Sequence, residues 1–452
     1  MSLDKFKDTE VGKIPVNWDL VSIGDQLDLI TDYHSNGSYK TLREHVDLKE
    51  TQDYALMVRT TNFEQNNFTD SLRYVDKSAY EFLEKSKVYP DDIIMNKIAN
   101  AGSVYLMPDL KRPVSLAMNL FLLRMKPSVN QRYVYYYLKH NEKYLKTFAQ
   151  GSVTKTITKD NVKKFPLVVP PLDIQNKIDY VLSLFYKKIL ALENINKNLT
   201  NIVLLLFKNW FVDFNFLNEN NKPYKNDNGE LKDSILGLIP KDWNVDSLGK
   251  YVEIDRGFSY KGKYLSEEGI PLINLGNILP NSEFRLEKLK FYSGEFDKKY
   301  KVNVGDILVA NTDLTQNRLV LGSPIIVPSL IDEEDIIYSH HINRLSNFKL
   351  PKFYIFYNLL SERYNHMVSG YATGTTVLAI SKESITNYKI LIPPEELILK
   401  FDELAKNIEK IKDNNLIEME KLTKLRNILL PKLMSGEIDV SQLDYLNNSI
   451  ER

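Results

Sequence analysis

Two long segments of the chain carry apolar residues at alternating spacings of four and three, which is typical of coiled-coil helices with one apolar seam. The first follows Pro170-Pro171, and its seam comprises Ile178, Leu182, Phe185, Ile189, Leu192, Leu199, Val203 and Leu206. The second follows Pro393-Pro394, and its seam comprises Phe401, Leu404, Ile408, Ile411, Leu422, Leu425 and Leu429. Prolines are tolerated where a helix begins. The pattern therefore predicts two long helices.

Each seam has one polar residue near its middle, Asn196 in the first and Asn415 in the second. A buried asparagine can fix the register of a helix pair, but a partly hydrated position explains the pattern equally well. Two seams in one chain indicate that the two helices pack on each other. Because each helix follows its own globular segment, an antiparallel pair would hold these segments at opposite ends.

The remaining apolar residues form short runs between turn-forming residues. Strands are predicted from the β-rich runs at 92–95, 167–169, 306–309 and 389–392. Aromatic runs at 133–138 and 353–357 predict helices, and we interpret their rings as core packing rather than as stacking platforms for bases. The predicted fold class is α+β.

The chain is also a tandem of two similar halves. Residues 11–24 and 236–249 are identical at six of fourteen positions and share the motif Gly-x-Ile-Pro-x-x-Trp. Further matches join 58–63 to 273–278, 90–94 to 304–308, and 151–171 to 374–394. The offset varies between 214 and 225, as expected when loops of a duplicated segment gain and lose residues.

We therefore predict two homologous mixed α/β domains separated by a long antiparallel two-helix coiled coil. The predicted divisions are an N-terminal domain at 1–170, a first helix at 171–213, a polar linker at 214–235, a C-terminal domain at 236–393, a second helix at 394–435 and a tail at 436–452.

Composition and charge narrow the possible functions. The chain has no cysteine, which excludes disulfides, a thiolate nucleophile and cysteine-based zinc sites. Without a long apolar run or a signal-peptide core, a cytoplasmic location is expected. The net charge is zero, but residues 1–110 have 12 Lys and Arg against 19 Asp and Glu, whereas 111–170 have 12 against 2. Such a local basic face suits contact with phosphates, although a solvated lysine-rich surface is an equal alternative.

Catalytic motifs are absent from the sequence. There is no GxxxxGK[ST] phosphate loop, no HExxH pair, and no methyltransferase motif for a cofactor or for a flipped base. The adjacent His340 and His341 are expected to point to opposite faces of a strand. We predict no catalytic residue, no metal site and no cofactor.

One pattern leaves an enzymatic alternative open. Asp91, Asp109 and Lys111 have the loose spacing of a nuclease in which two carboxylates bind Mg²⁺ and a lysine supports the attacking water. The matching half lacks the first carboxylate, and a turn before a strand explains Asp92 and Asp306 in both halves. The alternatives are thus a Mg²⁺-dependent DNA nuclease acting alone and a coiled-coil protein-interaction scaffold.

The repeated Gly-x-Ile-Pro-x-x-Trp motif, the Pro-Pro helix starts and the helix ends at 206–214 (LFKNWFVDF) and 425–436 (LRNILLPKLMSG) together resemble the specificity subunit of type I restriction–modification systems. The resemblance covers essentially the whole chain. It implies two DNA target-recognition domains, each of which reads one half of a bipartite site, and no catalytic role. It also implies that the helices set the gap and dock two methyltransferase subunits, and that restriction/translocase subunits complete the assembly.

In such a protein, phosphate contacts supply affinity and side chains at base edges supply specificity. The sharpest basic cluster lies at 155–164, beside hydroxyl-rich loops at 151–154 and 374–376. The candidate DNA-binding residues are Arg59, Asn62, Lys97, Ser152, Thr154, Lys155, Lys159, Lys163, Lys164, Arg256, Lys261, Asn274, Asn277, Asn311, Arg344, Thr375, Thr376 and Lys382. The candidate contacts to partner subunits are Phe207, Trp210, Phe211, Leu430 and Leu433.

Overall fold

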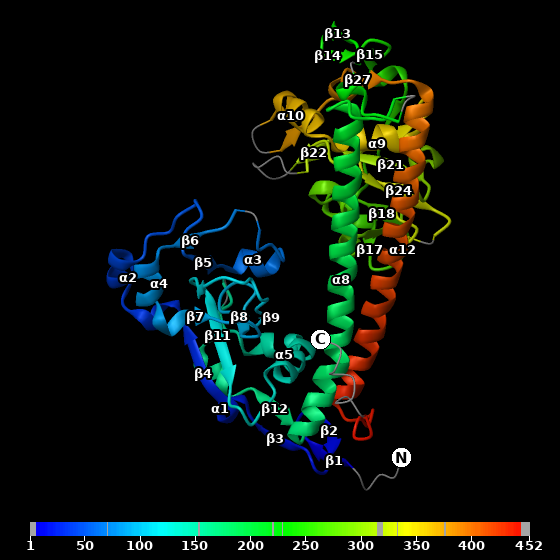
Figure 1. Ribbon diagram of the computed structural model, residues 1–452. Coiled ribbons are helices and arrows are strands. Elements are labelled where there is room, and N and C mark those ends of the chain that lie inside the picture. The colour runs from blue at the N-terminus through cyan, green and yellow to red at the C-terminus, as the bar shows by residue number, and fades with distance from the viewer. Residues whose placement is uncertain are drawn as a thin grey trace. The chain divides into compact units, whose positions relative to one another are not determined.

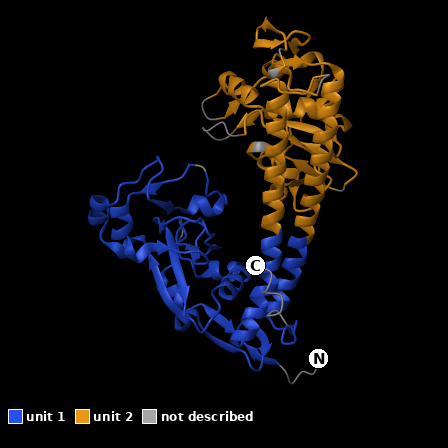
Figure 2. Cartoon of the chain, viewed as in Figure 1, with its two compact units in different colours: residues 1–188, 422–452 blue, residues 189–421 orange. Residues whose placement is uncertain are grey.

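The chain forms two compact units, each of which contains one of the two similar halves. The computed structural model describes residues 6–69, 71–151, 154–218, 221–227, 229–313, 320–331, 333–374 and 377–443 (Figure 1). The N-terminal unit comprises residues 1–188 and 422–452, and the C-terminal unit comprises residues 189–421 (Figure 2). Both long helices pass from one unit to the other, so each unit includes a part of each helix.

The two long helices begin directly after the proline pairs, as the sequence predicts. They are α8 (Leu172–Phe211) and α12 (Glu395–Met434). In the C-terminal unit, Asn415 Nδ2 donates to Asn196 Oδ1 at 2.7 Å, and the rings of Phe207 and Phe401 lie 5.6 Å apart. Later residues of α8 therefore meet earlier residues of α12, which makes the pair antiparallel. The predicted fold class is confirmed.

The seam of α12 differs from the prediction at three positions. Leu404, Ile411 and Leu425 are 46%, 48% and 50% exposed, whereas Ala405 is fully buried beside Phe401. The apolar residues of α12 form a stripe wider than one seam, so spacing alone does not show which edge of the stripe faces α8. The small side chain of Ala405 lets the helix pack closely at that position, and Leu404 is left at the surface.

Two four-stranded sheets form the globular part of the N-terminal unit. The first sheet is antiparallel, in the order β4 (Leu27–Asp32), β11 (Leu120–Met125), β8 (Ile93–Asn96) and β9 (Val104–Leu106). The order of the second is β6 (Tyr74–Val75), β5 (Ala55–Val58), β10 (Val114–Leu116) and β7 (Lys87–Val88), with β5 and β10 parallel. The N-terminal unit also has two separate antiparallel strand pairs. They are β1 (Phe6–Thr9) with β2 (Gly12–Pro15) and β3 (Asp19–Ser22) with β12 (Pro166–Val169).

The C-terminal unit repeats this topology. Its antiparallel sheet has the order β16 (Glu253–Arg256), β25 (Ile342–Ser346), β21 (Ile307–Ala310) and β23 (Pro324–Ile326). Its mixed sheet has the order β17 (Leu265–Ser266), β19 (Lys290–Tyr292), β18 (Ile270–Ile273), β24 (Ile336–Tyr338) and β20 (Lys301–Val302). The pairs are β13 (Leu231–Ser234) with β14 (Gly237–Pro240) and β15 (Asn244–Ser247) with β27 (Lys389–Ile392). The same strand order, apart from the added β17 and the added pair of β22 (Thr312–Asp313) with β26 (Leu378–Ala379), shows the duplication in the fold.

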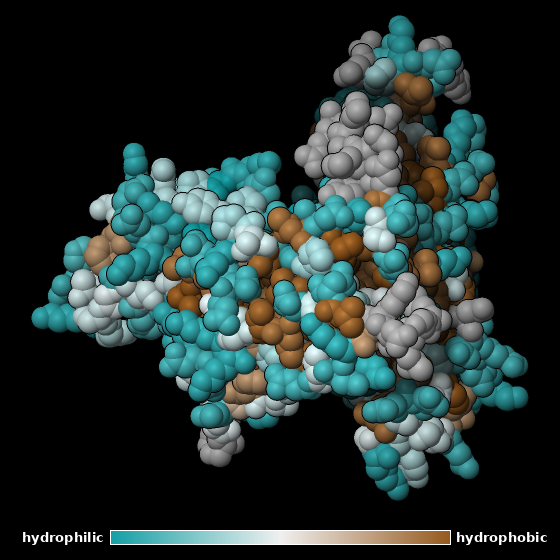
Figure 3. All heavy atoms as spheres, turned by 90° about the horizontal axis from the view of Figure 1, so that it is seen from below, coloured by the Kyte–Doolittle hydropathy of each residue, from teal (hydrophilic) through white to brown (hydrophobic). Residues whose placement is uncertain are grey.

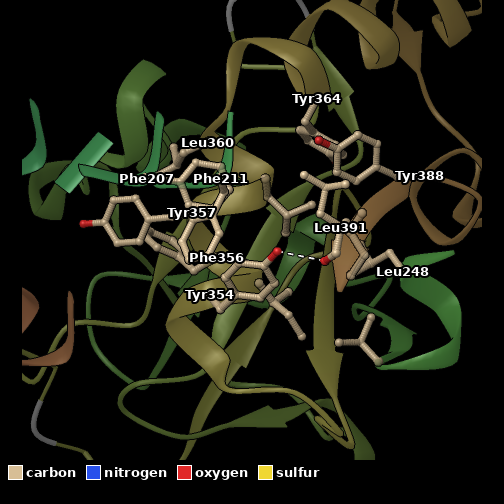
Figure 4. Packing of buried hydrophobic residues seen from close by; sticks show 14 of the residues in the cluster. Phe207, Phe211, Leu248, Tyr354, Phe356, Tyr357, Leu360, Tyr364, Tyr388 and Leu391 are labelled. Carbon is tan, nitrogen blue, oxygen red and sulfur yellow. Dashed lines mark hydrogen bonds between the residues drawn. The ribbon is translucent and has the colours of Figure 1, made fainter. Parts of the chain in front are cut away.

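The aromatic helices belong to the cores, as expected. They are α5 (Gln131–His140) in the N-terminal unit and α9 (Lys352–Leu360) in the C-terminal unit. Tyr133 and Tyr354 are fully buried, and their hydroxyls donate to the carbonyl oxygens of Val168 at 2.9 Å and Leu391 at 2.8 Å. Figure 4 shows the second of these bonds within the aromatic packing of the C-terminal unit.

The segment at 214–235 is not a purely exposed linker. Phe214 and Phe216 are buried, and the ring of Phe216 stacks on Trp243 at 5.2 Å and on Tyr224 at 4.9 Å. The composition of this segment is polar, so the two phenylalanines do not stand out in the sequence. They bury apolar area because Trp243 presents a ring to them.

Candidate nucleic-acid interface

One edge of each unit gathers several loops, and we call it the loop edge. In the N-terminal unit it includes the end of β4, the turn after β8 and the start of α7 (Lys159–Lys163). Ile157 N donates to Lys97 O at 3.0 Å, and Lys97 N donates to Asn119 O at 2.8 Å. In the C-terminal unit, Ile380 and Asn311 make the corresponding bond at 2.9 Å. The loop edges are therefore equivalent.

A glycine-dependent turn belongs to each loop edge. Gly151 has a φ of +119° and Gly374 a φ of +109°, a region that favours glycine. A Cβ at either position would collide with a carbonyl oxygen, that of Thr154 in one unit and that of Val377 in the other. The two glycines are thus structural. Three predicted residues of these turns, Ser152, Thr375 and Thr376, lie outside the described residues.

At the N-terminal loop edge, one carboxylate is bonded to two lysines of the same unit. Asp32 Oδ2 accepts a bond from Lys97 Nζ at 2.9 Å, and Asp32 Oδ1 accepts bonds from Lys159 Nζ at 3.2 Å and Ser35 Oγ at 2.8 Å. Burial opposes ionisation of Asp32, but the bonds from Lys97 and Ser35 and the charge of Lys159 outweigh it and lower its pKa to about 2. Asp32 therefore holds the two lysines in place.

The C-terminal loop edge has a different set of charges at the same positions. Asp32 pairs with Phe121 on β11, and Arg256 pairs with Asn343 on β25, one residue after the strand start in both cases. Arg256 therefore stands where Asp32 stands. Asn311 stands where Lys97 stands, because each directly follows the equivalent strand, β21 or β8. Lys382 stands where Lys159 stands, because each is the first residue of the equivalent helix, α11 (Lys382–Thr386) or α7. Lys382 Nζ donates to Ile254 O at 2.7 Å.

His340 and His341 do not point to opposite faces of a strand. They form a turn between β24 and β25, and their ring centroids are 3.9 Å apart. His341 Nδ1 lies 3.0 Å from Thr312 Oγ1. The alternation of a strand does not apply here because the strand ends at Tyr338.

Several side chains that the sequence predicts to bind DNA make hydrogen bonds that stabilise turns within the unit. Asn62 Oδ1 accepts from Arg59 N at 2.8 Å, and Asn277 Oδ1 accepts from Asn274 N at 2.9 Å, so the two motifs close the same turn after β5 and β18. Asn311 Nδ2 donates to His340 O at 3.1 Å and is buried. Buried amides need such partners, and these are committed within the fold.

Two predicted arginines are also engaged in the chain. Arg59 Nη2 donates to Ser71 O at 2.7 Å. Arg344 binds the carboxylate of Asp255 at 2.9 Å and the carbonyl of Lys301 at 2.9 Å. Although burial opposes ionisation, the bonds from Arg344 and Ser346 hold the pKa of Asp255 below its usual value.

The remaining described candidates are exposed at the surface of their units. They are Thr154, Lys155, Lys163, Lys164, Arg256, Lys261 and Lys382. Asp32, Lys290, His340 and His341 at the loop edges were not among the predicted residues. The correspondence of Asp32 with Arg256, at an offset of 224, becomes visible only once strand register aligns the loops.

The nuclease trio does not form a carboxylate pair open to a metal. Asp91 Oδ1 lies 2.9 Å from Arg132 Nη2, and Asp109 Oδ2 lies 2.5 Å from Lys111 Nζ. In the part of the chain that the structure describes, no group of three or more His, Cys, Asp or Glu is arranged to hold a metal ion. Asp92 accepts from Tyr89 N and Asp306 from Asn303 N, the turn role expected in both halves.

The predicted partner contacts are mostly interior. Phe207, Phe211 and Leu433 are buried in the cores of their own units, and Trp210 and Leu430 are half-buried. The first three are therefore packing residues, because an aromatic or leucine side chain inside the unit has no free surface. Exposed apolar side chains lie elsewhere on the helices, and Figure 3 shows apolar patches that interrupt the polar surface.

These exposed side chains occur at equivalent positions of the two helices. Counted from the proline pairs, Ile202 of α8 matches Leu425 of α12, and Leu205 matches Ile428. Their exposed fractions are 53% and 50%, and 66% and 57%. Ile202 and Leu205 belong to the C-terminal unit, whereas Leu425 and Ile428 belong to the N-terminal unit. We call these two pairs the end patches.

The comparison with protein families gives the identity of the fold. A model of the type I restriction modification DNA specificity domain matches twice, at residues 15–201 and 240–427. The chain belongs to this family. The two matches coincide with the two halves of the repeat, so the chain is a DNA specificity subunit with two recognition domains. Specificity subunits are the non-catalytic subunits of type I restriction–modification systems.

Individual relatives agree with this assignment along the whole chain. The type I restriction enzyme MjaIX specificity subunit of Methanocaldococcus jannaschii is 25% identical over 97% of this chain and 98% of its own length. The MjaVIII specificity subunit of the same organism is 25% identical over 98% of both chains. A crystal structure of a type I restriction–modification S subunit from M. genitalium has a TM-score of 0.50 and 15% identity, covering 95% of this chain and 98% of that one, which shows a shared fold. None of the helices in the described parts of the chain is both long and apolar enough to cross a membrane.

Proposed function

We propose that this specificity subunit reads a bipartite DNA site, with one unit for each half-site, and docks methyltransferase and restriction subunits. The observation that supports it best is the repeated sheet topology whose loop edges carry different charged residues at equivalent positions. A common scaffold with different side chains at one edge suits two readers of different sequences, since base edges are read by side chains and phosphates by cations.

The test is a domain exchange in the complex with the methyltransferase partner. Residues 236–393 are replaced with the matching domain of a relative, and the methylated bases are mapped across a genome. One half of the split site should change while the other half and the gap remain. If both halves change together, the two units are not independent readers.

The end patches are the surfaces we assign to two methyltransferase subunits. An exposed apolar pair of this kind on a helix stabilises a complex when a partner covers it. Because the pairs occupy equivalent positions of a duplicated helix, each can meet the same surface of one methyltransferase copy. One specificity subunit should then bind two copies.

This stoichiometry is tested by the mass of the purified complex. Ile202→Gln with Leu205→Gln should remove one methyltransferase copy, and Leu425→Gln with Ile428→Gln should remove the other. Lys406→Gln with Lys410→Gln, at exposed positions elsewhere on α12, is the control and should leave both copies bound. Loss of both copies from either double variant would contradict separate sites.

The long helices are the element that we expect to set the gap between half-sites. Inserting one heptad into both helices keeps the seams aligned and adds about 10 Å, which is about three base pairs of DNA. The mapped gap should grow by about three base pairs with both half-sites unchanged. Full activity with the original gap would show that other elements set the spacing.

A nuclease acting alone is the alternative that the ion pairs of Asp91 and Asp109 do not favour. The purified chain should cleave no DNA with Mg²⁺, transfer no methyl group and bind no S-adenosylmethionine. Cleavage that is lost in Asp91→Asn would support the nuclease instead.

A further inference from the structure

Four basic side chains gather at one turn of the C-terminal unit, and we call them the Arg256 cluster. They are Arg256, Lys290, His340 and His341. The imidazole rings of His340 and His341 lie 3.9 Å apart, and the charges of Arg256 and Lys290 both act on His341. Tyr260 joins the group, since Lys290 Nζ donates to its hydroxyl at 3.2 Å and its ring lies 6.4 Å from that of His340.

The backbone holds the histidine turn from two sides. His340 N donates to Phe258 O at 2.9 Å. Asn311 N donates to His341 O at 3.0 Å, and the buried Asn311 Nδ2 donates to His340 O at 3.1 Å. With these backbone groups already bonded, the two imidazoles are presented from a fixed frame, which lowers the entropic cost of binding a ligand.

The cluster has no carboxylate partner among the described residues. The Arg256 guanidinium makes no hydrogen bond or ion pair there, and His340 Nδ1 is buried without a hydrogen-bond partner. Burial, followed by the charges of His340, Arg256 and Lys290, lowers the pKa of His341. The two cations of the cluster, Arg256 and Lys290, lack a carboxylate partner among the described residues, and this favours an anion beside them.

Carboxylates on the adjoining strands are engaged elsewhere. Asp255, next to Arg256 on β16, binds Arg344 at 2.9 Å. Asp313 on β22 (Thr312–Asp313) is buried and accepts from Val320 N at 2.9 Å. The N-terminal unit differs in this respect, because there Asp32 itself occupies the position of Arg256.

We propose that the Arg256 cluster binds a backbone phosphate of the DNA, and that the N-terminal unit has no equivalent cation at this position. The inference rests on the proposed DNA-reading function and adds the contact atoms: the Arg256 guanidinium and the Lys290 ammonium as charged donors, with the two imidazole rings beside them. A phosphate matches this set because planar guanidinium and ammonium groups both donate to its oxygens.

The experiment measures DNA binding by the complex of the full chain with its methyltransferase partner. Two duplexes are used, one that contains the bipartite site mapped by methylome sequencing and one with both half-sites scrambled. Arg256→Gln and Lys290→Gln should each weaken binding to both duplexes several-fold and reduce the slope of log affinity against log salt by about one. Lys400→Gln, an exposed cation on α12 paired with Glu396, is the control and should change neither quantity.

The possible outcomes separate the two proposals. If the wild-type complex methylates no split site, the proposed function fails before any variant is examined. If it does, and the variants keep the wild-type salt slope, the phosphate contact is wrong while the proposed function stands. If Arg256→Gln weakens only the site-containing duplex, Arg256 reads a base, which also overturns the phosphate assignment. Thermal melting curves of Arg256→Gln and Lys290→Gln should equal that of the wild type and so show that both variants fold. For Arg256 this is expected because its side chain is exposed.

Discussion

The N-terminal and C-terminal units share a sheet order but carry opposite charges at one strand end. In the N-terminal unit, Asp32 ends β4 and binds Lys97 and Lys159. In the C-terminal unit, Arg256 ends β16, and Asn311 stands in the place of Lys97. One unit therefore uses its lysines to satisfy a carboxylate of its own, whereas the other leaves Arg256 without a carboxylate partner among the described residues.

The interiors of the two units do not differ in this way. Tyr133 and Tyr354 make the same buried bond to a carbonyl, and Gly151 and Gly374 close the same turn. After duplication, groups that hold the backbone are costly to change because a buried donor or acceptor would lose its partner. An edge residue can change charge with little loss of packing, so the edges are free to acquire different DNA contacts.

The largest difference between the edges is expected in stability. Asp32→Asn should lower the free energy of unfolding by about 2 kcal/mol at pH 7, whereas Arg256→Gln should change it by less than about 0.5 kcal/mol. Because the pKa of Asp32 is lowered from 3.8 to about 2, its contribution is complete above pH 4 and is lost as the pH falls toward 2. Urea unfolding at pH 7 and at about pH 3 measures this. Equal losses in the two variants would remove the distinction between the edges.

The second effect concerns DNA affinity of the N-terminal edge. Asp32→Asn releases Lys97 and Lys159, so binding to a scrambled duplex should strengthen about tenfold at low salt, and the salt slope should steepen by up to about two. Asp160→Asn, which removes an exposed carboxylate from α7, is the matched control for net charge. A similar gain in the control would mean that total charge, rather than release of the two lysines, explains the result.

The third expected effect is an equal loss of stability when the equivalent buried tyrosine of either unit is changed. Tyr133→Phe and Tyr354→Phe each leave a buried carbonyl without its donor and should each cost about 1 kcal/mol in thermal or urea unfolding. Burial raises the pKa of both tyrosines well above its ordinary value, so the loss should be constant between pH 6 and pH 9. Clearly unequal costs would show that the duplicated cores have diverged.

The smallest effect is the pH dependence of the C-terminal edge. Burial and its positive neighbours lower the pKa of His341 in the free chain, and a nearby phosphate would raise it, so DNA binding should take up a proton. Affinity should then increase by a few-fold as the pH falls from 7 to 6. His341→Gln should abolish this dependence while the Asp32→Asn variant retains it. A pH profile unchanged by His341→Gln would place the phosphate away from this ring.

Much of the fold could be predicted because it depends on residues close in sequence. The proline pairs mark the starts of α8 and α12, and the Gly-x-Ile-Pro-x-x-Trp motif marks the duplication. The site was harder to predict. Polar residues after a strand, such as Asn62 and Asn277, are equally suited to bind bases and to close a turn, and only the observed bonds to Arg59 N and Asn274 N decide between these roles.

The sequence by itself determined the helices, the repeat and the family, because periodicity and short motifs are properties of neighbouring residues. Tertiary structure decided which face of α12 meets α8, where Ala405 rather than Leu404 is buried. It also decided which charges are free. Asp32 meets Lys159 across 127 positions of the chain, and Arg256 meets no carboxylate among the described residues. The partner of a charge depends on strand register and loop closure, and these are set by the packing of distant segments.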